Sequence, residues 1–89
     1  MEDEEYLEKL ETGLYENGAM GLVAAIGDCI RAEGISKMAK KMGVSREGLY
    51  KSFSGRRKPN IETVLNALDG LGMRIVIMPK LRVKRHGKR

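Results

Sequence analysis

The sequence predicts an all-α protein, a bundle of five helices followed by a short C-terminal β-strand. Apolar residues recur at intervals of three and four in five stretches, as they do along the buried face of an amphipathic helix. Glycines and one Asn-Gly step separate most of these stretches, which is typical of helix ends and turns. The last apolar run, M-R-I-V-I-M, is short and rich in β-branched residues, which favours a strand.

Composition and charge limit the possible classes of protein. The chain has 89 residues, one Phe and no Trp, so one small domain must build its core mainly from Leu, Ile, Val, Met and Ala. Residues 1–33 hold nine acidic and two basic residues, a net charge of −7, whereas residues 34–89 hold three acidic and fifteen basic residues, a net of +12. The basic part suits a polyanion, and the acidic part suits a basic partner or serves solubility.

The first two helices are expected in residues 4–16 and 20–32. Leu7, Leu10 and Leu14 recur at helical spacing in the first, with Tyr6 and Tyr15 beside them. Asn17-Gly18 marks a turn. This acidic helix is either a solubilising cap or a docking surface for a basic partner. The second helix has a continuous apolar face (Leu22, Val23, Ile26, Cys29 and Ile30), and Gly27 within it suggests a close helix approach.

Ser36 to Ser54 reads as two short helices joined by a tight turn at Gly43-Val44. Gly43 tolerates the positive φ that such a turn needs, and the Ser45 hydroxyl can cap the second helix. Leu49 and Phe53, four residues apart, are expected to point inward. This pattern is typical of a helix-turn-helix that reads DNA.

A basic loop and a core helix follow. Arg56, Arg57 and Lys58 form either a charged turn or a phosphate clamp, and the position after the second short helix favours the clamp. Asn60 is expected to cap the next helix. That helix, residues 61–71, repeats apolar residues at helical spacing (Ile61, Val64, Leu65, Leu68 and Leu71).

Residues 73–78 are expected to form the lone strand. A strand without a partner leaves its backbone hydrogen-bonding groups open, so pairing with the same strand of a second copy predicts a homodimer. The dimerising residues would be Arg74, Ile75, Val76 and Ile77. The segment could instead lie on its own bundle or pair with a different protein.

Three regions are therefore expected along the chain. Residues 1–18 would form the acidic N-terminal helix, residues 19–79 the helix-turn-helix domain with its terminal strand, and residues 80–89 a basic, disordered tail. The sequence shows no signal peptide and no apolar run long enough to span a membrane, so the cytoplasm is the default location. A lone His, a lone Cys and no catalytic pair predict no metal site, no cofactor and no enzyme.

The segment from about Gly27 to Ile77 resembles a known family. The runs G-I-S-K-M-A and S-R-E-G-L-Y-K are the most specific signals. They are similar to the addiction-module antidote proteins, the HigA-like antitoxins of the Xre/lambda-repressor-like helix-turn-helix group. The resemblance implies an antitoxin that neutralises a small basic toxin, usually of the HigB/RelE/ParE-like kind, and represses its own operon as a dimer. The chain departs from the family's usual pattern at Ser52, in the Arg56–Asn60 loop and in its basic tail.

On this basis the second short helix would enter the major groove of double-stranded DNA at a palindromic operator. Arg46 would read guanine, and Glu47, Tyr50 and Lys51 would reach bases or flanking phosphates. Phosphate contacts would come from Ser36, Lys37, Ser45, Arg56, Arg57 and Lys58. A dimer would place two such helices about 34 Å apart. Alternatives are a stand-alone or phage-type repressor without a toxin, and a protein-interaction module with a vestigial helix-turn-helix.

Overall fold

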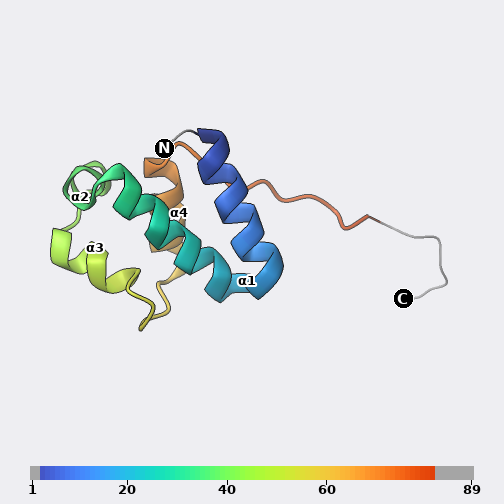
Figure 1. Ribbon diagram of the computed structural model, residues 1–89, viewed down its shortest axis with the longest axis horizontal. Coiled ribbons are helices and arrows are strands. Elements are labelled where there is room, and N and C mark those ends of the chain that lie inside the picture. Colours follow the sequence, from blue (N-terminus) through green and yellow to red (C-terminus); the bar gives the residue numbers. More distant parts are fainter. Residues whose placement is uncertain (1–2, 82–89) are drawn as a thin grey trace.

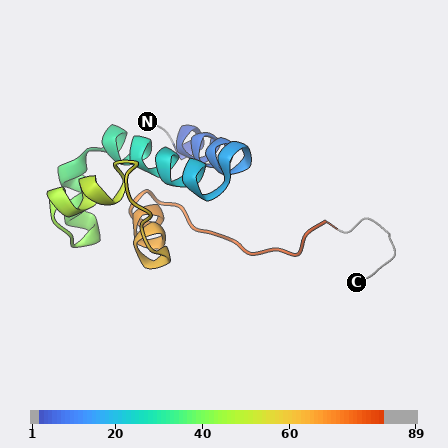
Figure 2. The same ribbon diagram turned by 90° about the horizontal axis from the view of Figure 1, so that it is seen from below.

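The computed structural model describes residues 3–81 and contains four helices and no strand in that range (Figure 1). The helices are α1 (Asp3–Glu33), α2 (Ile35–Met42), α3 (Arg46–Ser52) and α4 (Ile61–Gly70). Figures 1 and 2 both show α2 and α3 at one end of the helical bundle and the first half of α1 at the other. The all-α class is confirmed, and the basic tail lies outside the described residues from position 82 onward.

The prediction of five helices followed by a strand is wrong in two respects. The segments expected as separate helices in residues 4–16 and 20–32 form one element, α1, of 31 residues. Its backbone is non-helical only at Asn17 (φ −134°, ψ 16°) and Gly18 (φ 62°, ψ −141°), the positions of the expected turn. Because the chain changes direction within two residues, helical hydrogen bonding resumes without an intervening loop.

The second error concerns residues 73–78, which form no strand. Within the described chain no other segment pairs with this stretch, so its backbone lacks the ladder that defines a strand. Met73 packs against the core, but the residues predicted to dimerise (Arg74, Ile75, Val76 and Ile77) are all exposed.

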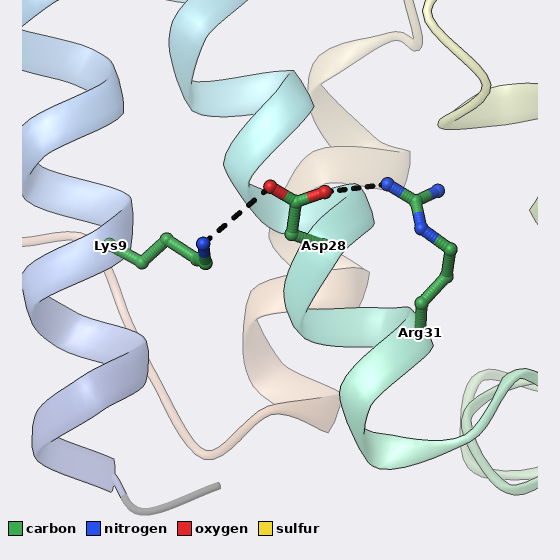
Figure 3. Close-up of polar contacts among 3 residues, drawn as sticks. All are labelled: Lys9, Asp28 and Arg31. Atoms are coloured by element: carbon green, nitrogen blue, oxygen red, sulfur yellow. Dashed lines mark hydrogen bonds and ion pairs between the residues drawn. The ribbon is translucent and has the colours of Figure 1, made fainter.

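The two halves of α1 pack closely against each other. A Cβ added at Gly13 would lie 2.5 Å from the carbonyl oxygen of Gly21, so the halves meet where neither residue has a side chain. The Asp28 carboxylate lies between two cations, 3.7 Å from the Lys9 ammonium on the first half and 2.6 Å from the Arg31 guanidinium on the second (Figure 3). These side chains are about half exposed, so the two ion pairs contribute little to the free energy of folding.

The core lies between the second half of α1 and the three shorter helices. Ile26, Met38 and Leu49, from three different helices, are almost completely buried. A Cβ added at Gly27 would lie 2.9 Å from the carbonyl oxygen of Phe53, which confirms the expected close approach at that glycine. Cys29 is fully buried, and burial raises the pKa of its thiol.

The predicted apolar faces were correct only in part. In α1, Tyr6 and Leu10 are buried, whereas Leu7 and Leu14 are 47% and 50% exposed. In α4 the core side chains are Val64, Ala67 and Leu68, and the predicted core residues Ile61 and Leu65 lie on the surface. Both helices therefore bury a face rotated from the expected one, which leaves large apolar side chains exposed.

Candidate nucleic-acid interface

The turn between α2 and α3 is set by Gly43. Its φ of 69° and ψ of 33° are left-handed, a conformation that costs a side-chain-bearing residue energy. The Gly43 amide donates to the carbonyl of Lys40 at 3.2 Å, and the Val44 amide donates to the carbonyl of Ala39 at 3.0 Å. These bonds satisfy carbonyls at the end of α2 and fix the direction in which α3 begins.

The position of α3 depends on one cap and two buried side chains. The Gly48 amide donates a 2.9 Å hydrogen bond to the Ser45 hydroxyl, as the sequence predicted. Leu49 is 2% exposed and Phe53 is 4% exposed, so both hold the inner face of α3 against the bundle. With its start capped and its inner face buried, α3 presents its other face to solvent.

That outer face carries every residue predicted to read bases. Arg46, Glu47, Tyr50 and Lys51 are all exposed, and Tyr50 is 56% exposed, so its ring does not pack in the core. No hydrogen bond or ion pair joins any of these four side chains to another residue between positions 3 and 81. The structure thus brings the four together on one short helix, with their polar groups available to a ligand.

The predicted phosphate contacts lie on both sides of α3 along the chain. Ser36 and Lys37 are exposed in the first turn of α2, and Arg56, Arg57 and Lys58 are exposed in the loop that follows α3. Asn60 closes that loop by accepting a 2.8 Å hydrogen bond from the Thr63 amide at the start of α4. The Ser45 hydroxyl already accepts the cap bond, which leaves its proton for a phosphate oxygen.

One of these cations has a protein partner that the sequence reading missed. The Lys37 ammonium lies 2.7 Å from a carboxylate oxygen of Glu33, and the other carboxylate oxygen accepts a hydrogen bond from the hydroxyl of Tyr6. The bond from Lys37, and then that from Tyr6, lowers the pKa of Glu33 from 4.5 to about 2. The same contact, followed by burial, raises the pKa of Tyr6 to about 12.

This Tyr6–Glu33–Lys37 chain connects the first half of α1 to the first turn of α2. Glu33 and Lys37 lie four residues apart but on different helices, with the non-helical Gly34 between them, so helical periodicity does not predict their ion pair. No sequence signal points to Tyr6, which lies 27 residues before Glu33. These contacts therefore restrain the orientation of α2 relative to the first half of α1.

The charges of the molecule are separated in space. Figures 1 and 2 place α3 and the first half of α1 at opposite ends of the helical bundle, so the acidic residues of that half lie away from α3. A polyanion approaching α3 therefore meets mostly cations at close range, and the acidic end repels it from the wrong side.

Between positions 3 and 81, no helix is both long and apolar enough to cross a membrane. Within the same range, His, Cys, Asp and Glu side chains form no group of three or more that could hold a metal ion.

Comparison with known proteins gives one family and one relative. A family model described as "Probable addiction module antidote protein" matches residues 1–79. A protein of Haemophilus influenzae (strain Rd), described as an uncharacterized protein, is 36% identical over 64 residues, which are 72% of this chain and 66% of that protein. The match covers slightly less than two thirds of the relative's length. No solved structure matches the chain.

Proposed function

The chain belongs to the family of probable addiction module antidote proteins, and from this premise we propose that it is an antitoxin that also represses its own operon. The family description implies a toxin as partner and a regulator rather than an enzyme. The outer face of α3 supports the DNA-binding part, because it gathers an Arg, a Glu, a Tyr and a Lys whose side chains bond to no other residue within positions 3–81. The arrangement of α2 and α3 also supports a place in the Xre/lambda-repressor-like group, with the HigA-like antitoxins.

In this proposal α3 enters the major groove of an operator with its N-terminal end first. The Arg46 guanidinium donates two hydrogen bonds to O6 and N7 of a guanine, and Glu47 accepts from the amino group of a cytosine. Tyr50 and Lys51, one turn further along α3, contact neighbouring bases or phosphates. Because all four side chains are exposed, none has to leave the core to reach DNA.

The remaining basic and hydroxyl side chains position the protein on the DNA backbone. Ser36, Lys37 and Ser45 bind phosphates at one edge of α3, and the Arg56–Lys58 loop binds those at the other edge. Lys37 can keep its bond to Glu33, since an ammonium group has three donors. The departure from the family pattern in this loop strengthens backbone contacts and leaves base readout to Arg46.

The operator-binding form is proposed to be a homodimer that contacts DNA at two half-sites, with Arg74–Ile77 in the contact between copies. A two-fold dimer matches a palindromic operator whose half-sites lie a whole number of helical turns apart. The exposed apolar side chains of this segment support an interaction there, because Val76 is 67% and Ile77 is 92% exposed.

A paired assay in cells tests the two activities separately. The DNA upstream of the coding sequence drives a reporter, and any small gene that adjoins the coding sequence is expressed as a candidate toxin. Wild-type protein is expected to repress the reporter and to restore growth. Arg46→Ala is expected to lose repression and to keep growth rescue, because Arg46 lies on the end opposite the acidic part of α1. Full repression by Arg46→Ala would contradict the assignment of α3.

The exposed acidic and apolar residues on the first half of α1 favour a second candidate. In that case the protein is an interaction module whose helix-turn-helix no longer reads DNA. Growth rescue without any repression by the wild-type protein would support this candidate. Repression at a locus that encodes no toxin would instead support a stand-alone or phage-type repressor.

A further inference from the structure

The first half of α1 exposes an apolar stripe that is bordered by carboxylates. Leu7 and Leu14 are 47% and 50% exposed, and a spacing of seven residues places them on one side of the helix, two turns apart. Glu4 and Glu11 lie three residues before and four residues after Leu7, so they border the same stripe. We call these four residues the acidic face. Residues 3–16 hold six acidic residues and one Lys, a net charge of −5.

The C-terminal extension, residues 73–81, has the complementary character. After Met73 its apolar side chains are exposed, with Ile77 92% and Leu81 93% exposed. Arg74 and Lys80 are exposed as well, and the chain contains no acidic residue after Asp69. Both views show the extension leaving the bundle and projecting away from it (Figures 1 and 2). Exposed apolar residues in such a row mark a contact surface.

We propose that the acidic face of one copy binds the C-terminal extension of a second copy, in a reciprocal two-fold dimer. This inference rests on the homodimer of the proposed function and specifies its contact. The carboxylates meet Arg74 and Lys80, and the Leu7–Leu14 stripe covers the isoleucines of the extension. The extension is long enough to lie along the acidic face, since nine extended residues span up to about 30 Å and the fourteen residues of helix about 21 Å.

Two other arrangements are less favourable on charge and geometry. If the extensions of two copies paired with each other, two strongly basic segments would come together, since residues 70–89 hold seven Lys and Arg residues and no carboxylate side chain. Docking on the acidic face of the same chain would cover the isoleucines, yet Ile77 is 92% exposed. A reciprocal exchange places opposite charges at both contacts of the dimer and leaves α3 of each copy free.

Charge reversal on each side, followed by mixing, tests the contact. The first variant of the full chain carries Glu4→Lys and Glu11→Lys, and the second carries Arg74→Glu and Lys80→Glu. All four side chains are exposed, so both variants should keep the helical circular dichroism of the wild type. Sedimentation equilibrium at micromolar concentration and low salt is expected to give twice the chain mass of 9.9 kDa for the wild type.

The expected result is that each variant alone is a monomer and that the equimolar mixture is a dimer. In the mixture both contacts again join opposite charges, whereas each variant alone joins like charges. If the first variant alone dimerises as well as the wild type, the acidic face is not the binding surface and the proposal is overturned. A mixture that stays monomeric also overturns it. A monomeric wild type would overturn both this contact and the homodimer of the proposed function.

Apolar substitutions give a second, independent test. Leu7→Ser is expected to weaken dimerisation about tenfold or more, because the Leu side chain would lose its burial at the contact. Leu65→Ser on α4 is the matched control, since Leu65 is 45% exposed and lies outside the acidic face. Equal effects of the two substitutions, or a larger effect of Leu65→Ser, would place the contact elsewhere and overturn the proposal.

Discussion

At the scale of single residues, the Ser45 hydroxyl decides where α3 begins. It accepts the hydrogen bond from the Gly48 amide, a donor that would otherwise lack a partner in the helix. Ser45→Ala is therefore expected to lower the free energy of unfolding by about 1 kcal/mol. Urea denaturation measures the change, and Ser36→Ala, at an exposed residue within α2, is the control. An equal loss in both variants would contradict the role of the cap.

Glu33 is expected to make the stability depend on pH. The contacts with Lys37 and Tyr6 lower its folded-state pKa from 4.5 to about 2. The stabilisation is then fully present above pH 4.5 and is lost as the pH falls toward 2. Glu33→Gln should lower the free energy of unfolding at pH 6 and have a shrinking effect between pH 4.5 and 2. A difference that stays constant in urea denaturations across this range would contradict the assignment.

Two arginines are expected to contribute differently to DNA binding. Arg46→Ala removes a base contact and should cost about 1–3 kcal/mol on the operator while relaxing the preference at one position. Arg57→Ala removes a phosphate contact and should weaken binding to all sequences alike, with a shallower salt dependence. Fluorescence anisotropy on operator and random DNA separates the two outcomes. A uniform loss of affinity in both variants would remove Arg46 from base readout.

At the scale of elements, the close approach of α1 to the end of α3 depends on Gly27. An added methyl group would lie 2.9 Å from the Phe53 carbonyl, a backbone atom that cannot move aside cheaply. Gly27→Ala is expected to destabilise the fold by about 1–3 kcal/mol despite the higher helix propensity of Ala. Gly70→Ala is the matched control, because its nearest neighbour, at 2.9 Å, is the flexible methyl end of Met38.

The two glycine variants should therefore differ in sign or size when thermal unfolding is compared. Gly70→Ala is expected to be near neutral, since the Met38 side chain can adjust. If Gly27→Ala is as close to neutral as Gly70→Ala, the contact between α1 and α3 is looser than the structure shows.

The elements with local signals could be predicted from the sequence. The Gly43 turn, the Ser45 and Asn60 caps and the inward Leu49 and Phe53 follow from chemistry within four residues along the chain, and all of them were correct. The same local reasoning placed the base-reading candidates on one exposed face. Those candidates remain predictions for DNA, because exposure shows only that they can be reached.

Features that depend on distant contacts could not be predicted. Apolar spacing gave the right helix at residues 61–71 but only part of its buried face. Val64, Leu68 and Leu71 are buried as expected, whereas Ile61 and Leu65 are exposed and Ala67 is buried. Which face is buried depends on which other elements pack against the helix, and apolar periodicity alone does not identify those elements. The expected strand at residues 73–78 failed for the same reason, because β-branched residues favour a strand only where another strand pairs with them.

At the scale of the whole molecule, the two ends of the helical bundle differ in charge and in exposed side chains, which favours a different binding partner for each end. The end with α3 (Figure 1) presents cations and the side chains that are candidates for base reading, and the end with the first half of α1 presents carboxylates and exposed leucines. In the proposed function, specific DNA binding at one end would leave the other end accessible to protein, whether a second copy or a toxin. Affinity for DNA should accordingly fall steeply with salt, because several phosphates are neutralised together.

The most direct test of the central claim, that α3 reads a specific DNA sequence, is the ratio of two dissociation constants. Binding of the full chain is measured by competition at physiological salt, on the DNA upstream of its coding sequence and on random DNA of equal length. The upstream DNA is expected to bind about 1,000-fold more tightly or better. A ratio near one, for a protein with wild-type helical content, would contradict specific recognition by α3.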